Sequence, residues 1–130
     1  MDEKTKNILI QKAREALPHA YSHYSGFSVA AALLTSDGEI ITGVNVENSS
    51  FGLSICAERS AIVAAVAKQK RHFAAIAIVS SSAKPTPPCG ACRQFMREFG
   101  DFEVILAGDN EEIITSVSEL LPLAFLMKGH

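Results

Sequence analysis

The sequence predicts a single α/β domain over residues 1–130, a three-layer α/β/α sandwich around a five-stranded mixed sheet with an antiparallel last strand. Two observations carry the prediction: strand-like apolar runs alternate with segments of helical periodicity, and the last two strand-like runs are only four residues apart. A parallel pair needs a crossover of a dozen or more residues, so these two runs must be antiparallel if they pair.

The first helix is predicted near the amino terminus and should end at Pro18. Its apolar residues recur at helical spacing: Ile8, Leu9, Ala13, Ala16 and Leu17. Residues 28–35 then form a β-rich apolar run, and residues 39–46 resume extended structure after the turn at 36–38. This pattern predicts a β-hairpin.

The second helix is predicted over about residues 55–69. Its stretch 61–67 is apolar on every side, which indicates a buried helix. Residues 73–80 form a second continuous apolar run and should be a buried central strand. A Ser- and Pro-rich loop over 81–88 leads to a third helix, which should end at Gly100.

The carboxyl-terminal part contains two more strands and a short helix. The strands are expected at 103–107 and 112–115, and the helix should start at Ser118. The apolar residues 120–127 that follow are more than a small domain readily hides, and exposed patches of this kind commonly mark subunit contacts. We therefore expect a homo-oligomer.

Composition excludes several classes of function. Apolar residues make up 48% of the chain and charged residues 20%, which is typical of a globular protein rather than a disordered one. The net charge is −2 and the basic residues form no stripe, so we expect no nucleic-acid partner. A small neutral substrate fits better.

The amino-terminal segment is charged and has no apolar core of signal-peptide length. No apolar run approaches the length of a membrane span, so no membrane partner is expected. An odd number of cysteines without an export signal favours a reducing compartment. We expect a cytoplasmic protein.

All three cysteines lie in two short motifs, Cys56-Ala-Glu58 and Pro88-Cys-Gly-Ala-Cys92. Thiolates are strong zinc ligands, and a structural zinc normally has four protein ligands, whereas a catalytic zinc keeps one position open. No histidine stands at ligand spacing from these thiols; the four are His19, His23, His72 and His130. Three cysteines therefore favour an open zinc site, with Cys56, Cys89 and Cys92 as ligands.

Two other interpretations of the cysteines remain open. Cys89 and Cys92 at a helix start resemble a thioredoxin-like dithiol, but this leaves Cys56 and Glu58 without a role. A structural zinc module would need a fourth protein ligand from elsewhere in the chain.

Both motifs match the signature of zinc-dependent base deaminases. The segment 43–61 closely resembles the small zinc-dependent cytidine deaminases of the cytidine and deoxycytidylate deaminase family. The segment 24–29 resembles their substrate-stacking segment, and 119–125 resembles their carboxyl-terminal signature. The short return between the last two strands also resembles the nucleoside enzymes more than the nucleic-acid editing relatives, which insert a helix there.

The resemblance implies the cytidine deaminase-like fold and one Zn²⁺ per subunit of a homotetramer. It implies hydrolytic deamination of cytidine and deoxycytidine to uridine and deoxyuridine plus ammonia, in pyrimidine salvage. Blasticidin S deaminases are of similar size and share the zinc motifs, so an aminopyrimidine nucleoside of that kind is the alternative substrate. Ala30 stands where the family usually has Gly, which affects no catalytic residue.

The chemistry predicts roles for two residues beside the ligands. Zinc would lower the pKa of bound water toward about 7, and Glu58 would carry protons from water to the pyrimidine N3 and to the departing amine. Three thiolates leave Zn²⁺ with a formal charge of −1, and Arg59 would offset it by donating to the sulfurs. Alternatively, Glu58 is an ordinary first-turn acid and Arg59 a surface residue.

Further residues are expected to contact the substrate. Asn45 and Glu47 alternate along the end of a strand, so both point to one face, where the resemblance implies binding of ribose hydroxyls. Alternatively, they are simply turn residues. The resemblance also implies that the ring of Phe27, otherwise an ordinary core residue, stacks on the pyrimidine. It implies substrate contact at Ala57, and that two aromatic residues approach the site from neighbouring subunits: Phe51 and Phe125.

Overall fold

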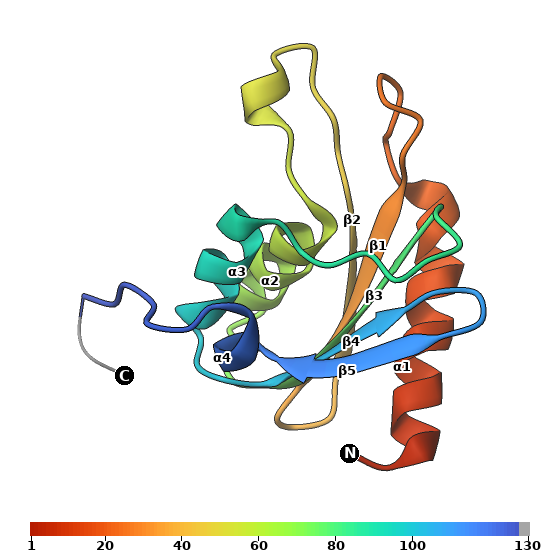
Figure 1. Cartoon of the computed structure of the whole chain (residues 1–130). Helices are drawn as coiled ribbons and strands as arrows, with labels where there is room; N and C mark the ends of the chain where they lie inside the picture. The colour runs from red at the N-terminus through yellow and green to blue at the C-terminus, as the bar shows by residue number, and fades with distance from the viewer. Residues whose placement is uncertain (128–130) are drawn as a thin grey trace.

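The computed structural model describes residues 1–127 and contains one five-stranded sheet flanked by helices (Figure 1). The main elements are α1 (Glu3–Ala16), β1 (Val29–Thr35), β2 (Ile40–Val44), α2 (Ala57–Ala67), β3 (Phe73–Ser80), α3 (Gly90–Arg97), β4 (Glu103–Ala107), β5 (Glu112–Ser116) and α4 (Val117–Leu120). Two 3₁₀ turns, Leu17–His19 and Phe51–Leu53, complete the list. His130, one of the four histidines considered above, lies outside the described residues.

The strands are ordered β2-β1-β3-β4-β5, so β3 is central as predicted. Only β3 and β4 are parallel, and α3 connects them; the other three pairs are antiparallel. The predicted mixed sheet with an antiparallel last strand is therefore confirmed. β3 is buried along almost its whole length because both faces of the sheet are covered.

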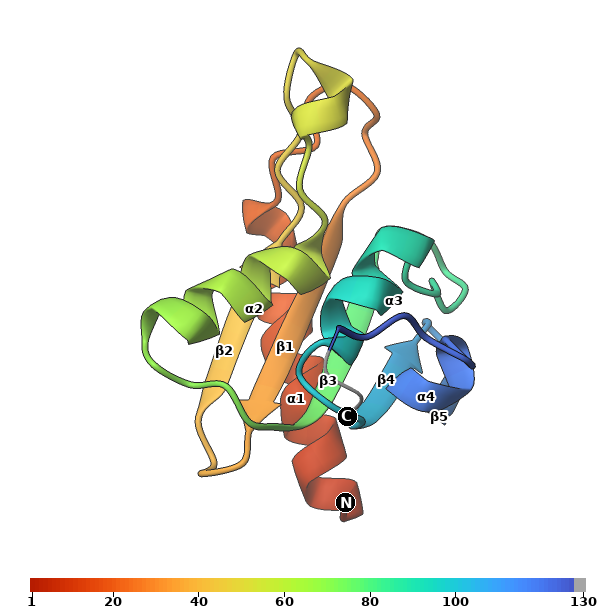
Figure 2. The ribbon, with the colours of Figure 1, turned by 90° about the vertical axis from the view of Figure 1, so that its left-hand side faces the viewer.

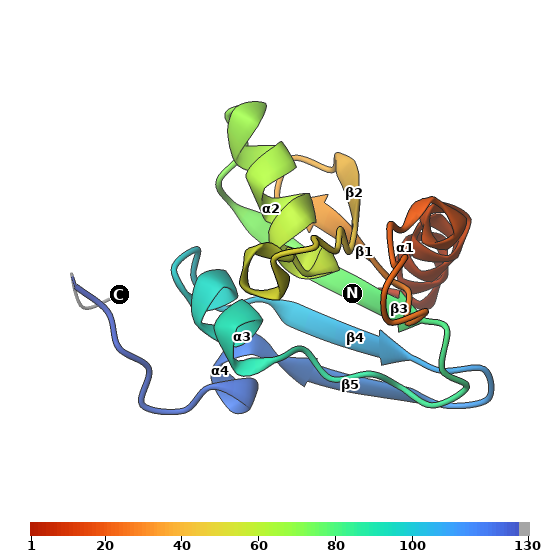
Figure 3. The same cartoon turned by 90° about the horizontal axis from the view of Figure 1, so that it is seen from above.

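Helices cover both faces of the sheet, which confirms the three-layer architecture (Figure 3). α1 packs on one face through Leu9, Ile10 and Ala13, against small side chains such as Ala32 and Ala77. α2 and α3 pack on the other face, where larger side chains form the second core. The small residues of β1 and β3 allow α1 to lie close to the sheet.

α2 lies very close to β2, and Gly43 permits this approach. A Cβ atom at Gly43 would be 2.3 Å from the backbone nitrogen of Ala61 and 2.7 Å from the carbonyl oxygen of Ala57. No side chain fits at such distances, so glycine sets the depth at which α2 packs on the sheet. This contact fixes the helix whose beginning carries Cys56 and Glu58.

The outer face of α2 differs from the prediction. Ala61, Ile62 and Ala65 are buried, but Val63 is 50% exposed and Val66 is also exposed in the single chain. The expectation of burial on every side is therefore wrong for the isolated chain, because no other element of residues 1–127 covers this face.

The loops before β1 and after β2 project beyond the same end of the sheet (Figures 1 and 2). β2 ends at Val44, two residues earlier than predicted, because the ladder between β1 and β2 ends at the pair Ala30–Val44. Single bridges then join Val46 to Tyr21 and to Ile55. Within the described part of the chain, no helix combines the length and apolarity needed to cross a membrane.

Candidate active site

The three cysteines converge at the beginnings of α2 and α3. Cys56 is the N-cap of α2, Cys89 is the N-cap of α3, and Cys92 lies in the first turn of α3. Their sulfur atoms lie within 4.8 Å of one another, and the Cys56 and Cys89 sulfurs are 3.8 Å apart. Among residues 1–127, no histidine or carboxylate joins this group as a fourth ligand.

The chemistry of the thiols fits a divalent soft cation. A hydrogen bond from the Cys92 thiol lowers the pKa of Cys56 to about 5. The same contact and burial raise the pKa of Cys92, because a second negative charge beside the first is unfavourable. Without a cation, an ionised Cys56 therefore disfavours ionisation of Cys92. Zn²⁺ held by Cys56, Cys89 and Cys92 would supply the charge that lets the sulfurs ionise, and a zinc ion with three protein ligands would keep a position for water.

Glu58 lies beside the sulfurs with its carboxyl group buried. The residue is only 3% exposed, and its Oε1 atom has no hydrogen-bond partner. Burial raises the pKa of Glu58 to about 7, with a smaller contribution from the nearby Cys56. A carboxyl group that exchanges its proton near neutral pH is suited to general acid and base catalysis.

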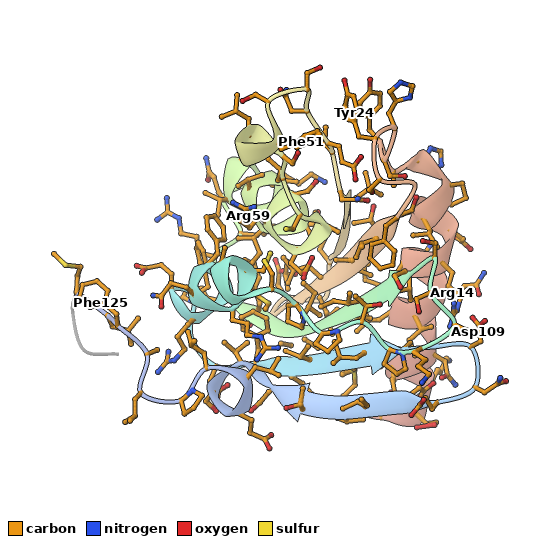
Figure 4. All side chains as sticks on the ribbon, turned by 45° about the horizontal axis from the view of Figure 1, so that its top comes forward. Arg14, Tyr24, Phe51, Arg59, Asp109 and Phe125 are labelled. Carbon is orange, nitrogen blue, oxygen red and sulfur yellow. The ribbon has the colours of Figure 1, made fainter. Side chains whose placement is uncertain are left out.

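Arg59 extends from the first turn of α2 toward the cluster (Figure 4). Its Nη2 atom lies 3.7 Å from the Cys56 sulfur and 3.5 Å from the carbonyl oxygen of Ser54. The Cys56 contact raises the pKa of the guanidinium, which is therefore a permanent positive charge beside the sulfurs. Its Nε atom is buried without a partner.

A cavity of about 360 Å³ opens in front of these groups. Five of the predicted site residues line it together with two of the cysteines: Phe27, Asn45, Glu47, Cys56, Ala57, Glu58 and Cys89. They come from the loop before β1, the chain after β2, and the starts of α2 and α3. The structure thus brings two of the predicted metal ligands, the predicted acid and the residues expected to contact the substrate to one place.

Comparison with known families decides the class of protein. Residues 3–108 match the model of the cytidine and deoxycytidylate deaminase zinc-binding region. The chain belongs to this deaminase family. The predicted family and the zinc-binding region are therefore confirmed, and the thioredoxin-like alternative is set aside.

Several relatives of this family member resemble it over nearly the whole length. A cytidine deaminase from Halalkalibacterium halodurans is 49% identical over 92% of the chain and 93% of its own length. The crystal structure of cytidine deaminase from Burkholderia pseudomallei superposes with a TM-score of 0.90 at 46% identity, covering 96% of this chain and all of that one. A blasticidin-S deaminase from Bacillus cereus is 30% identical over 94% of the chain and 97% of its own.

The two predicted sugar-binding side chains of the deaminase already bind its own backbone. Asn45 accepts from the Val29 amide and donates to the Phe27 carbonyl oxygen, both at 2.9 Å. Glu47 accepts from the amides of Tyr24 and Ser25 at 2.9 and 3.0 Å and from the Ser25 hydroxyl. The hydrogen bonds from Ser25 lower the pKa of Glu47, which is therefore an ionised acceptor.

The two aromatic residues expected from neighbouring subunits do not line this cavity within one chain. Phe51 is 73% exposed and makes an edge contact with Tyr24, with ring centroids 5.9 Å apart. Phe125 is 70% exposed and lies on the carboxyl-terminal segment, well apart from Phe51 (Figure 4). The expectation that they contact the sites of neighbouring subunits stays a prediction.

Other lining residues were missed from the sequence: Ser25, Val29, Ser54, Ile55, Thr86 and Pro87. Two of them could have been found from their position in the sequence, although not from their residue type. Ser25 lies inside the segment that resembles the stacking segment, and Thr86 comes shortly before Pro88 in the loop that leads to the second zinc motif. Serine and threonine are common in loops, so neither residue stands out by type.

Proposed function

We propose that the chain is a zinc-dependent hydrolase that converts cytidine and deoxycytidine to uridine and deoxyuridine with release of ammonia. The observation that carries the proposal is the buried Glu58 carboxyl next to three converging sulfurs, beside a cavity of nucleoside size. The near full-length similarity to cytidine deaminases supports the choice of substrate.

The proposed reaction adds the oxygen of water to C4 of the pyrimidine and breaks the bond between C4 and its amino nitrogen. Zinc held by Cys56, Cys89 and Cys92 supplies Lewis acidity, so that water can attack near neutral pH. Glu58 takes the first proton that water gives up and passes it to N3. It then takes the second proton, from the hydroxyl group now on C4, and delivers it to the departing amine. Its pKa of about 7 suits both directions of transfer.

The remaining lining residues hold the nucleoside. Phe27 stacks on the pyrimidine ring, and Asn45 and Glu47 exchange hydrogen bonds with the sugar hydroxyls. Ala57, the first residue of α2, contacts the base beside Glu58. The lining carries carboxylates but no lysine or arginine, which favours a neutral nucleoside over a nucleotide.

We assign to Arg59 the role of tuning the metal. Three thiolates overcompensate the charge of Zn²⁺, and the Arg59 guanidinium lies close enough to the Cys56 sulfur to withdraw part of that charge. Replacing Arg59 with Ala should reduce both turnover and zinc retention, whereas replacing Arg71, which does not line the cavity, should leave both unchanged. Unchanged kinetics in the Arg59 variant would end this assignment.

We propose a homotetramer in which neighbouring subunits complete each site. The exposed apolar side chains of α2 and the carboxyl-terminal segment supply subunit contact surfaces: Val63, Val66, Leu123, Phe125 and Met127. A hollow of about 390 Å³ beside the cavity is lined by Tyr24 and Phe51 and leaves space for a partner's side chain. Light scattering that finds a monomer at assay concentration would contradict the proposal.

The deciding experiment follows cytidine deamination by ultraviolet absorbance with the wild type and Glu58→Gln, each assayed for bound zinc. The proposed function requires rapid turnover by the wild type and loss of turnover by a fully zinc-loaded variant. Rates measured in parallel on deoxycytidine and blasticidin S test the alternative substrate, which is the one named for the Bacillus cereus relative.

We place this reaction in pyrimidine salvage and in a reducing compartment such as the cytoplasm. All three cysteines are free thiols, and reduced thiols are required for zinc binding. The chain would act there as one catalytic domain without a nucleic-acid or membrane partner.

A further inference from the structure

Ser25 lines the cavity, although the proposed function assigns it no role. Its hydroxyl group makes two hydrogen bonds at once. It donates to Glu47 Oε2 and accepts from the Phe27 amide at 2.9 Å. A serine hydroxyl has one proton to donate and two lone pairs to accept with, so both bonds can form together. Ser25 thus connects the expected sugar-binding carboxylate to the expected base-stacking residue.

The backbone of Phe27 is held on both sides by this arrangement. Its amide donates to Ser25, and its carbonyl oxygen accepts from Asn45 at 2.9 Å. Gly26, with φ of 72°, forms the turn between Ser25 and Phe27 that brings the hydroxyl back to the amide. This loop lies outside the regular elements, so these hydrogen bonds are what orient the Phe27 backbone.

Glu47 has room for one more donor after these contacts. Its Oε1 atom accepts two backbone amides, while Oε2 accepts only the Ser25 hydroxyl. A carboxylate offers about four acceptor positions, so a sugar hydroxyl can bind Oε2 beside Ser25 without displacing it. The Ser25 hydroxyl therefore fixes the direction from which Glu47 receives the substrate.

We propose that Ser25 is a positioning residue that aligns Glu47 and Phe27 as one unit, so that sugar recognition and base stacking depend on each other. This inference rests on the proposed function. Ser25 does not touch the reacting atoms, so it governs substrate binding and leaves the chemical step at Glu58 unaffected.

The test compares Ser25→Ala with the wild type on cytidine. Loss of a hydrogen bond to a charged group should raise KM roughly tenfold, while kcat stays within about twofold and bound zinc is unchanged. Ser25→Thr retains the hydroxyl and should recover most of the affinity. Thermal unfolding of each variant checks that the exposed loop change leaves the fold intact.

Ser118 provides a matched control. Its amide and hydroxyl both donate to the Asp101 carboxylate, at 2.9 and 2.7 Å, as those of Ser25 do to Glu47, but it does not line the cavity. Ser118→Ala should therefore leave KM unchanged.

The coupling itself is tested in a Glu47→Ala background. There the Ser25 hydroxyl has lost its carboxylate and keeps only the Phe27 amide, so adding Ser25→Ala should raise KM clearly less than it does in the wild-type background. Three outcomes would each overturn the inference. Ser25→Ala could raise KM equally in the two backgrounds, leave KM unchanged in the wild-type background, or lower only kcat or the zinc content. Absence of wild-type turnover on cytidine would instead refute the proposed function, so the two failures are distinguishable.

Discussion

Replacing Glu58 with Gln should abolish most turnover and, at the same time, stabilise the zinc-free protein at neutral and higher pH. The residue is buried, and its Oε1 atom has no partner to offset the charge of an ionised carboxylate. Glutamine has nearly the same shape and cannot ionise. One substitution therefore removes both the proton carrier and the cost of burying its charge.

The size of the expected stabilisation follows from the pKa of Glu58. Burial raises it from 4.5 to about 7, and a rise of this size corresponds to about 3 kcal/mol in the free energy of unfolding. Below pH 4.5 the carboxyl is protonated in both the folded and the unfolded chain, so the penalty is absent. Between pH 4.5 and 7 only the unfolded chain ionises, and stability falls as pH rises. Above about pH 7 the penalty is complete.

Urea unfolding of both zinc-free proteins, in reducing buffer at pH 4.5 and pH 8, measures this effect. The advantage of Glu58→Gln over the wild type should grow by about 3 kcal/mol between the two pH values. Taking the difference between the proteins removes most of the contribution of Cys56, whose lowered pKa changes stability in the opposite direction, because Cys56 makes only a smaller contribution to the pKa of Glu58. With zinc bound, kcat should fall by roughly 10²–10⁴. A stability difference that is constant with pH would refute the reasoning about burial, and a wild-type kcat would refute the catalytic role.

Two further predictions concern the metal and the packing of α2. Cys92→Ser removes a buried ligand, so zinc should transfer to a colorimetric chelator at least about tenfold faster than from the wild type, and an unchanged rate would mean that the metal is held elsewhere. Gly43→Ala would place a Cβ 2.3 Å from the Ala61 nitrogen and should lower the free energy of unfolding by about 1–3 kcal/mol or more, with weaker zinc retention as α2 shifts. Gly52→Ala meets nothing within 4 Å and should change stability by less than about 0.5 kcal/mol, and equal losses in both variants would show that the close approach does not matter.

Much of the fold could be predicted because burial leaves a direct pattern in the sequence. The runs at 28–35 and 73–80 are apolar except at their ends, and they contain β1 and β3, which are covered on both faces. The order of the strands could not be predicted in the same way. The antiparallel pairing of β1 with β3 depends on contacts such as Ala31 with Ile78, which are far apart in sequence and leave no local signal.

The metal ligands could be predicted because few residue types bind zinc and their spacing places them at helix starts. The support of the substrate loop could not, because it depends on hydrogen bonds across the chain. Asn45 and Glu47 were expected to face a sugar, and the structure adds that they also hold residues 24–29. In the proposed tetramer, the surroundings of Phe51 and Phe125 depend on neighbouring subunits, which no pattern within one chain describes.

Both helices that carry the sulfurs begin without an ordinary cap. Cys56 and Cys89 occupy the N-cap positions, and neither thiol accepts a hydrogen bond from the first turn. A serine or aspartate there would add about 1 kcal/mol of helix stability. The first turns of α2 and α3 should therefore fray when zinc dissociates. Deuterium uptake by the amides of these turns would then report the fraction of zinc-loaded molecules in a mixed sample, without any nucleoside present.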